Sequence, residues 1–226
     1  MQRCILLVLM MNLPITVQAV ESTCYGTTKN GRLENSKKLP AQGKNYVSYS
    51  TLAAMTGRTY VHSKVYEVVV SAYQSLQKDM STKKYKYAET GFEHGGKFRP
   101  HKTHQNGLSV DFMTPVINQQ GESDTLPSHV FNKFGYSIEF DKNDQYDGYS
   151  IDYEAMAAHI VALQKASVKH GVEIWRVIFD PKLQPKLFKT RYANFIKNNI
   201  QFSKKRSWVR HDEHYHVDFK VKCKSL

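Results

Sequence analysis

Histidine is concentrated in two short segments of this 226-residue chain. Three of the ten histidines lie in residues 94–104 and three in residues 211–216; they are His94, His101, His104, His211, His214 and His216. Imidazole is the commonest side-chain ligand of transition metals, and its pKa lies close to neutral pH. The two clusters therefore indicate a metal site, acid–base chemistry, or both.

The second cluster continues into a segment with the pattern of a strand. Apolar and polar side chains alternate over residues 214–221, and successive side chains of a strand point to opposite faces. The apolar side chains are then expected to pack on the core, while His214, His216 and Asp218 share the other face. One strand thus presents two imidazoles and a carboxylate together.

The first cluster leads into a second strand of the same kind. Alternation over residues 108–113 places Asp111 opposite the apolar side chains, and Gly107 permits a turn that brings His104 back beside it. Two adjacent strands can then present His104, Asp111 and His216 to one point. Two imidazoles and one carboxylate, with a coordination position left for water, are the composition of a catalytic zinc site. The plainer alternative is a set of surface histidines on a basic protein, with Asp111 in an ordinary salt bridge.

The elements that must position these strands follow from periodicity. Apolar spacing predicts helices over residues 63–78 and 152–170, a strand over residues 172–179, and a basic helix between residues 185 and 198. Residues 114–150 carry few periodic signals and are predicted to form a long surface insertion. Strands and helices do not alternate regularly, so the expected fold is α+β. We expect a single domain with a small antiparallel sheet that carries the zinc site, flanked by helices.

Composition and the N-terminal sequence bound the class of protein. With 41% hydrophobic and 23% charged residues, the chain is typical of a globular protein and not of a disordered, collagen-like or multi-span membrane protein. A basic residue, a short apolar run and a small-residue cleavage pattern predict a secretory signal peptide over residues 1–19, followed by one domain over residues 20–226. The apolar run is shorter than the roughly 20 residues of a membrane span. The mature protein is expected in the periplasm or outside the cell, with no integral membrane segment; the alternative is that residues 1–19 form a buried strand or helix.

The cysteines fit this prediction of export. Signal cleavage removes Cys4 and leaves Cys24 and Cys223, which are predicted to form a disulfide in an oxidising compartment. The alternative is two unpaired thiols. The sequence has no CxxC motif or four-cysteine cluster, which excludes a zinc ribbon.

Charge indicates the kind of partner. The chain carries 32 Lys and Arg against 20 Asp and Glu, a net charge of +12, which favours a polyanionic partner. Basic and aromatic residues interleave over residues 188–192 and 202–210, a pattern that also suits single-stranded nucleic acid. No nucleic acid partner is expected, because export removes it, and both segments are interpreted as a solvated basic face. The sequence does not indicate an oligomeric state.

Two motifs carry a resemblance to a known family. Residues 101–111 (HKTHQNGLSVD) and residues 211–217 (HDEHYHV) are similar, in spacing and in order along the chain, to the two histidine-rich segments of the penicillin-insensitive murein endopeptidases. The wider group includes lysostaphin-type peptidases, D-Ala-D-Ala metallopeptidases and sonic hedgehog-like proteins. It shares a His-x(6)-Asp and a His-x-His signature. The resemblance implies a zinc peptidase of the bacterial cell wall.

The resemblance also implies roles for individual side chains. The zinc ligands of the family correspond to His104, Asp111 and His216. The catalytic histidine next to the metal corresponds to His214, and the outer histidines, which lie at or near the site, correspond to His101 and His211. Both motifs together therefore imply a complete catalytic centre.

One motif of the family is incomplete here. Its Asp-Gly-x-His segment corresponds to Asp147-Gly148-Tyr149-Ser150, where the histidine is missing, and this argues against an additional metal site. His101 and Asp218 are candidates for an additional metal contact or for orienting a ligand imidazole. The plainer interpretation of Asp218 is a strand-edge charge paired with a lysine.

These residues predict an exported zinc metallopeptidase that hydrolyses peptide cross-links of bacterial peptidoglycan, as a D-alanyl endopeptidase. The free carboxylates of the wall's stem peptides suit a basic enzyme. Zinc lowers the pKa of its bound water toward about 7, and His214, with His211 as the second candidate, is expected to accept a proton or to stabilise the oxyanion. The alternatives are a D,D-carboxypeptidase, an L,D-endopeptidase, and a catalytically inactive envelope-binding protein that retains the metal.

Overall fold

The segments with the strongest apolar periodicity form the two longest helices of the structure. The structure is a computed structural model that describes residues 20–207 and 209–226. Helix α2 (Ser63–Asp79) and helix α3 (Tyr153–Lys169) occupy the predicted ranges, so both predictions are confirmed. The Asp152 side chain caps α3, because it accepts a hydrogen bond from the backbone amide of Ala155.

The main sheet contains both strands that were predicted to carry the site. Its order is β12 (Glu173–Ile178), β13 (His214–Lys220), β7 (Ser109–Met113), β6 (Tyr85–Tyr87) and β4 (Tyr46–Ser48). All neighbouring pairs are antiparallel except β4 with β6, which is parallel. The predicted α+β domain with a small antiparallel sheet is therefore confirmed, with one parallel pair added at the edge of the sheet.

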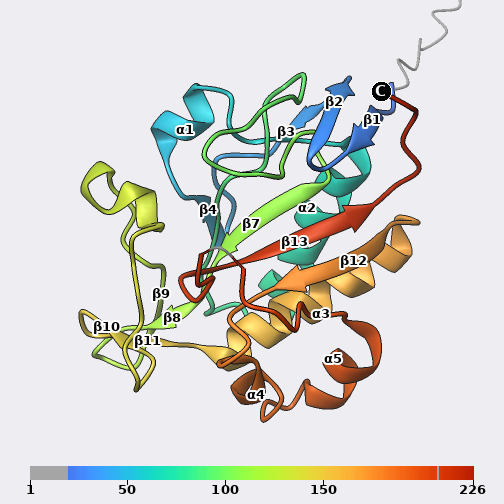
Figure 1. The fold of residues 1–226 in the computed structure, drawn as a ribbon. Helices are drawn as coiled ribbons and strands as arrows, with labels where there is room; N and C mark the ends of the chain where they lie inside the picture. Colours follow the sequence, from blue (N-terminus) through green and yellow to red (C-terminus); the bar gives the residue numbers. More distant parts are fainter. Residues whose placement is uncertain (1–19, 208) are drawn as a thin grey trace, which may run out of the picture.

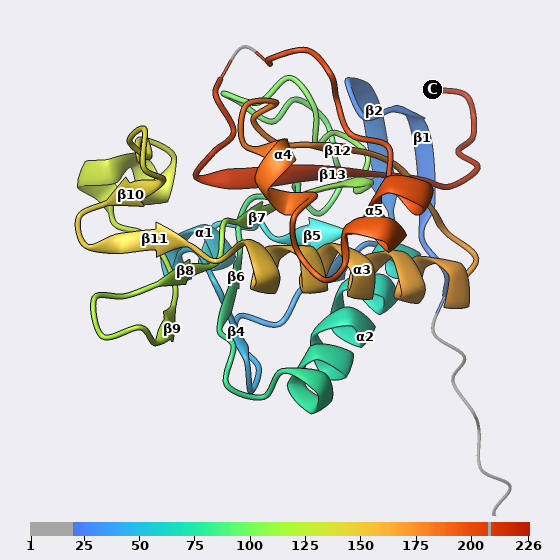
Figure 2. The same ribbon diagram turned by 90° about the horizontal axis from the view of Figure 1, so that it is seen from below.

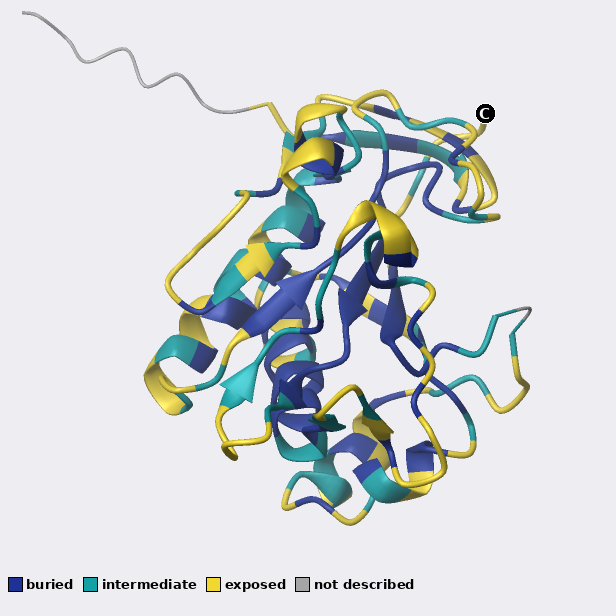
Figure 3. Ribbon diagram, turned by 90° about the vertical axis from the view of Figure 1, so that its left-hand side faces the viewer, coloured by how far each residue is buried: buried dark blue, intermediate teal, exposed yellow. Residues whose placement is uncertain are grey.

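Helices cover one face of this sheet and loops cover the other. Figure 1 shows β7, β13 and β12 side by side, and Figure 2 shows α2 and α3 together on one side of them. The apolar face of β13 packs toward these helices, since Tyr215 contacts His159 of α3 and Val217 is fully buried. The polar face of β13, with His214 and His216, is buried as well, and Figure 3 shows how the buried residues run through these central strands. The histidines thus lie in an interior site.

The remaining described elements are short. One small sheet has the order β10 (Gln145–Tyr146), β11 (Tyr149–Ile151), β8 (Val116–Ile117) and β9 (Ser123–Asp124), and two further pairs are β1 (Thr23–Thr27) with β2 (Asn30–Glu34) and β3 (Lys37–Lys38) with β5 (Tyr60–Val61). The short helices are α1 (Thr51–Met55), the 3₁₀ helix η1 (Val130–Gly135), α4 (Gln184–Leu187) and α5 (Ala193–Asn199). Within the described ranges, no helix combines the length and the apolar character that crossing a bilayer requires.

Two segments differ from the sequence-based expectation. The prediction of a single basic helix between residues 185 and 198 is wrong, because this segment contains two separate helices, α4 and α5. Turns connect the two helices: the amide of Thr190 donates to the carbonyl of Leu187 at 3.2 Å, and the amide of Ala193 donates to the carbonyl of Thr190 at 3.1 Å. The Thr190 hydroxyl also donates to the Leu187 carbonyl at 2.8 Å. Residues 114–150 were predicted to be a surface insertion with few periodic signals; they contain β8, β9, η1 and β10, and β11 begins within them.

The predicted disulfide links strand β1 to the C-terminal segment of the chain. Cys24 in β1 is bonded to Cys223 near the C-terminus, and the pair is confirmed. Lys224 reinforces this link, because its backbone amide donates to the carbonyl of Cys24 and its carbonyl accepts from the amide of Gly26, both at 2.9 Å. The predicted signal peptide, residues 1–19, lies outside the described residues.

Candidate metal centre

Asp111 and His216 face each other across strands β7 and β13. They are direct partners in the register of the two strands, and Nδ1 of His216 lies 2.7 Å from Oδ1 of Asp111. Nε2 of His104 lies 3.4 Å from the same oxygen. All three side chains are buried. The structure therefore gathers the three predicted ligands around one carboxylate oxygen.

A left-handed turn brings His104 to this position. His104 has φ +69° and Gly107 has φ +75°, a region that glycine adopts without steric cost. A Cβ atom at residue 107 would lie 2.5 Å from Cδ2 of Leu33 and 2.7 Å from the backbone nitrogen of His62. Gly107 is therefore required both for the turn and for the close approach of neighbouring chain. The turn returns the chain into β7 with His104 beside Asp111.

The site contains a buried nitrogen that lacks a hydrogen-bond partner. Within the described part of the chain, Nε2 of His104 makes no hydrogen bond, whereas its Nδ1 lies 3.1 Å from the carbonyl oxygen of Thr90. Leaving a buried polar atom unpaired costs about 1–3 kcal/mol. A cation held by His104, Asp111 and His216 would satisfy this nitrogen, and two imidazoles with one carboxylate are the donors of catalytic zinc sites. The chemistry of these donors suits a metal ion.

Asp218 holds the ring of His216 from the side opposite Asp111. Oδ1 of Asp218 accepts hydrogen bonds from Nε2 of His216 at 2.8 Å and from the Ser109 hydroxyl at 2.6 Å. Its Oδ2 accepts a hydrogen bond from Nε of Arg176 at 2.7 Å. Burial acts to raise the pKa of Asp218, but the charge and hydrogen bond of His216 outweigh it and hold that pKa well below its ordinary value. The counter-ion of the buried Asp218 carboxylate is thus Arg176, and Asp218 also contacts His216, which is a candidate metal ligand.

The two oxygens of Asp111 have different neighbours. Oδ2 accepts a hydrogen bond from the Tyr136 hydroxyl at 2.9 Å, and Nδ1 of His101 and Nε2 of His214 lie 3.9 and 3.8 Å from it. The ligand atoms of His101, His104 and Asp111 all lie within 4.8 Å of one another. Asp111 is therefore the central residue of the cluster, with two histidines at one oxygen and two at the other.

Each histidine beside Oδ2 is paired with a buried glutamate. Nδ1 of His214 lies 2.8 Å from Oε1 of Glu213, and Nε2 of His101 is paired with Glu89, which also binds Arg58. Burial acts to raise the pKa of Glu89, but hydrogen bonds from His101 and Arg58 outweigh it and hold that pKa at about 2. Burial lowers the pKa of His214, yet attraction to Glu213 and Asp111 leaves it above its ordinary value. Both glutamates therefore stay ionised and orient the rings.

His211 lies next to His214 at the edge of the cluster. The two ring centroids are 4.5 Å apart, and Nδ1 of His211 lies 3.0 Å from the carbonyl oxygen of Val209. A carbonyl only accepts, so Nδ1 carries the proton and Nε2 is left as an acceptor. Burial and the neighbouring His214 lower the pKa of His211 to about 4, which keeps this ring neutral at neutral pH.

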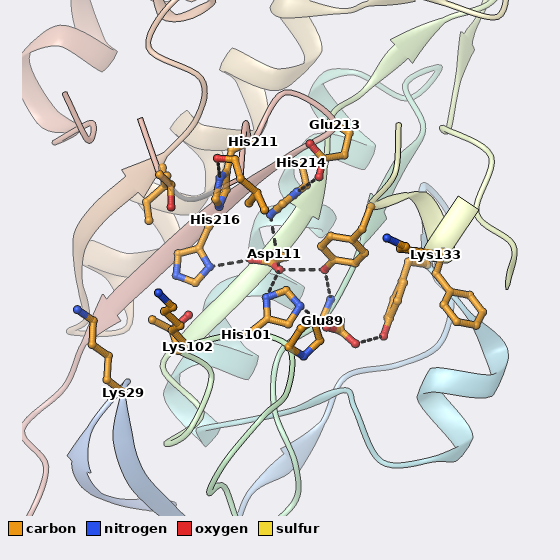
Figure 4. Close-up of a pocket in the computed structure, with 18 of the residues that line it drawn as sticks. Lys29, Glu89, His101, Lys102, Asp111, Lys133, His211, Glu213, His214 and His216 are labelled. Carbon is orange, nitrogen blue, oxygen red and sulfur yellow. Dashed lines mark hydrogen bonds and ion pairs between the residues drawn. The ribbon is translucent and has the colours of Figure 1, made fainter. Parts of the chain in front are cut away.

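The cluster opens into a cavity of about 710 Å³. Figure 4 shows Asp111 at its centre with His101, His214 and His216 around it. The polar lining is formed by Lys29, Tyr49, Glu89, His101, Lys102, Thr103, Asp111, Lys133, Tyr136, Arg176, Ser207, His211, Glu213, His214 and His216. The cavity is large enough for a peptide segment, because small-molecule sites commonly occupy about 300–1,000 Å³.

Several residues of the cavity were missed by sequence reasoning, and three of them contact the predicted site residues: Glu89, Tyr136 and Glu213. Glu213 lies within the second histidine motif, directly before His214. This adjacency could have identified it as a partner of His214 from the sequence. Glu89 and Tyr136 reach the site from segments with no motif, after β6 and at the end of η1. The exposed His94, which belongs to the first histidine cluster, does not take part in the lining of the described cavity.

An interior cluster of imidazole and carboxylate donors at the base of an open cavity is an arrangement that metal-dependent hydrolases use. The family model of the penicillin-insensitive murein endopeptidases matches residues 24–225. The chain therefore belongs to this family, as the two motifs predicted, and it is a peptidase of peptidoglycan. No curated protein matches the chain.

Proposed function

We propose that the protein is an exported, zinc-dependent endopeptidase that cleaves D-alanyl cross-links of bacterial peptidoglycan. One observation supports the metal in particular. Nε2 of His104 and Nδ1 of His216 both face Oδ1 of Asp111, while the outer nitrogen of each ring contacts a protein oxygen. Outer contacts of this kind orient the histidine ligands of metal sites. His104, Asp111 and His216 are the proposed zinc ligands.

His101 is the competing ligand. Its donor atom lies close to those of His104 and Asp111, and its Nε2 is paired with Glu89. Its Nδ1, however, is 3.9 Å from Oδ2 of Asp111, farther than the 2.7 Å between Nδ1 of His216 and Oδ1. Its ring is also close to that of His104, with centroids 5.0 Å apart, so His101 is the alternative to His216 as the second histidine ligand. We assign His101 to the wall of the cavity, where its ring can form a hydrogen bond with substrate.

The protein's own side chains handle the proton of the reaction. When bound, zinc supplies Lewis acidity that polarises a peptide carbonyl and lowers the pKa of water. Glu213 holds Nδ1 of His214, so Nε2 of His214 points toward Asp111 and can accept a proton from the attacking water. The same nitrogen can then donate a proton to the leaving amine. His211, with Nε2 as an acceptor, is the second candidate for this role.

Export is part of the proposal. The Cys24–Cys223 disulfide is typical of an oxidising compartment, and the sequence of residues 1–19 has the pattern of a signal peptide. Peptidoglycan lies outside the cytoplasmic membrane, so a peptidase of the wall has to reach it there. We propose a periplasmic or secreted location.

The test is release of soluble muropeptides from purified sacculi by the mature protein. Mass spectrometry of the products identifies the bond that is cleaved. The wild type is compared with a chelator-treated sample, a His216→Ala variant, and a His94→Ala control that alters an exposed histidine outside the cavity. We expect release by wild type and control, and none after chelation or His216→Ala.

Other results would redirect the proposal. Release of terminal D-alanine alone would identify a D,D-carboxypeptidase, and products cut at an L,D bond would identify an L,D-endopeptidase. Binding of sacculi by folded, zinc-loaded protein without any release would support a binding protein and contradict the proposed activity.

A further inference from the structure

Three lysines line the cavity, and their charges are not neutralised by the protein. Across the described residues, the side chains of Lys29, Lys102 and Lys133 form no ion pair. The cavity's arginine, by contrast, is bound to Asp218. The carboxylates of the lining are likewise occupied by protein partners, as described above. Among the described lysine and arginine side chains of the lining, these three therefore have a charge that is available to a ligand.

The lysines lie at two opposite ends of the cavity. Figure 4 shows Lys29 and Lys102 on one side of Asp111 and Lys133 on the other. Lys29 comes from the turn between β1 and β2, Lys102 from the loop before β7, and Lys133 from η1. Three separate segments of the chain thus place positive charge on both sides of the candidate metal centre.

Lys133 is held in place by an unusual turn. Lys133 and Phe134 have φ +50° and +58°, a left-handed conformation that costs free energy for residues other than glycine. Asn132 stabilises the turn, because its Oδ1 accepts hydrogen bonds from the backbone amides of His129 and Gly135, both at 2.9 Å. The sequence therefore maintains a strained backbone at the point where Lys133 faces the cavity.

The same turn is tied to the candidate metal centre. Two residues after Phe134, the Tyr136 hydroxyl donates to Oδ2 of Asp111. The ring of Phe134 packs edge-on against Tyr49, with centroids 6.2 Å apart, and the Tyr49 hydroxyl donates to Glu89 at 2.8 Å. These contacts fix the backbone of the turn from which the exposed side chain of Lys133 extends.

We propose that Lys133 on one side, and Lys29 and Lys102 on the other, bind carboxylate groups of the peptide substrate. This inference rests on the proposed function and specifies its substrate class: a cross-linked peptide with a free carboxylate on each side of the scissile bond. A lysine ammonium acts as a compact point charge with three hydrogen-bond donors, which suits a carboxylate reached in several orientations. An amidated stem peptide lacks this charge and is discriminated against.

The test uses soluble cross-linked muropeptide dimers in three forms: with free stem-peptide carboxyl groups, amidated on the donor stem only, and amidated on the acceptor stem only. The variants are Lys133→Gln, Lys102→Gln and Lys29→Gln, with Lys133→Arg as the charge-preserving variant. Lys142→Gln is the matched control, because Lys142 is exposed and lies outside the cavity lining. Thermal unfolding checks that each variant is folded.

We expect each amidation to lower the kcat/KM of the wild type about tenfold, mainly through KM, as expected for loss of one charged hydrogen bond. Lys133→Gln should also lower kcat/KM about tenfold on the free dimer. For this variant, amidation of the stem whose carboxylate Lys133 binds should cause no further loss of kcat/KM. Lys102→Gln and Lys29→Gln should show this coupling with the other stem. Lys142→Gln should remain close to the wild type, and Lys133→Arg, which keeps the charge, should keep the preference for the free dimer over the amidated ones.

Two failures are distinguishable. If the wild type cleaves none of the dimers, the proposed endopeptidase activity fails and this inference fails with it. If the wild type cleaves free and amidated dimers equally well, or if the lysine variants lose the same factor on all three dimers, carboxylate recognition by these lysines is wrong while the proposed function stands.

Discussion

The Tyr136 hydroxyl donates a hydrogen bond to Oδ2 of Asp111 at 2.9 Å, while Oδ1 of the same carboxylate faces His104 and His216. The Tyr136 oxygen in turn accepts a hydrogen bond from the backbone amide of Glu89 at 3.2 Å. The Glu89 amide thus holds the Tyr136 hydroxyl in place, and that hydroxyl in turn holds the Asp111 carboxylate. The Tyr136 contact determines which oxygen of Asp111 is turned toward the two proposed histidine ligands.

Tyr136→Phe should therefore weaken zinc binding. Loss of an outer hydrogen bond to a metal ligand typically costs about 10–100-fold in affinity or activity, and we expect a loss in this range, with the fold retained. Competition with a chelating dye measures the zinc Kd. Tyr146→Phe, which changes a tyrosine outside the cavity lining, is the control. An unchanged Kd in Tyr136→Phe would show that the contact does not orient the ligand.

His104→Ala should abolish stoichiometric zinc binding. The substitution removes the buried nitrogen that lacks a partner, and two protein ligands remain where a catalytic zinc site has three. Metal analysis after dialysis should give about one zinc per wild-type chain and much less than one for the variant. His94→Ala alters an exposed histidine of the same segment and should keep full occupancy. Full occupancy in His104→Ala would instead favour the His101 side of Asp111.

Glu213→Gln should lower kcat while leaving KM nearly unchanged. Glu213 lies 2.8 Å from Nδ1 of His214 and keeps Nε2 of His214 directed at Asp111. The amide of the glutamine variant should therefore misorient the His214 ring, which acts in the chemical step. General acid–base catalysis contributes about 10²–10⁴-fold, and loss of its positioning residue should cost at least tenfold. Steady-state kinetics on a cross-linked muropeptide measures both constants. Glu93→Gln, an exposed substitution outside the cavity, is the control; equal kcat values would rule out this role.

The parts of the site that follow from local sequence could be predicted. Alternation over residues 214–221 predicted the shared face of His214 and His216, and the glycine at residue 107 predicted a turn that returns His104 to Asp111. Helices α2 and α3 followed in the same way from strong apolar periodicity. In each of these cases the information lies in residues that are neighbours along the chain.

The parts that depend on contacts between distant segments could not be predicted. Tyr136 reaches Asp111 from a turn whose left-handed residues, Lys133 and Phe134, are not glycines and give no turn signal in the sequence. Glu89 acquires its role only because the segment after β6 runs beside β7. Residues 188–192 separate α4 from α5 through turns, with bonds such as the one from the amide of Thr190 to the carbonyl of Leu187, and the helical pattern of the sequence does not reveal them.

Removal of the disulfide should destabilise the protein without removing the zinc site. Cys24 and Cys223 are 199 residues apart, and in the chain-entropy model a loop of this length contributes about 5 kcal/mol by restricting the unfolded chain. The double variant Cys24→Ser/Cys223→Ser should lose up to this amount in the free energy of unfolding, measured in urea. Neither cysteine lines the cavity, so zinc stoichiometry should be unchanged. Equal stabilities of wild type and variant would contradict the expected contribution.

Stability should fall in mild acid because of His159. This side chain is fully buried between the sheet and α2, stacked on Tyr73 and hydrogen bonded to Tyr215, and burial lowers its pKa to about 3. The unfolded chain binds a proton at His159 below about pH 6.5, whereas the folded chain does not until about pH 3. The free energy of unfolding from this residue therefore rises with pH across that window, by about 1.4 kcal/mol per pH unit, and is constant above it.

His159→Phe isolates this contribution. Urea unfolding at several pH values between 4 and 6 should give a slope of stability against pH that is smaller than that of the wild type by about 1.4 kcal/mol per unit. Other buried groups titrate equally in both proteins and cancel in the comparison. His94→Gln, which changes an exposed imidazole, should leave the slope unchanged. If His159→Phe and the wild type have the same slope, His159 is protonated in the folded protein and the buried ring is not the source of acid sensitivity.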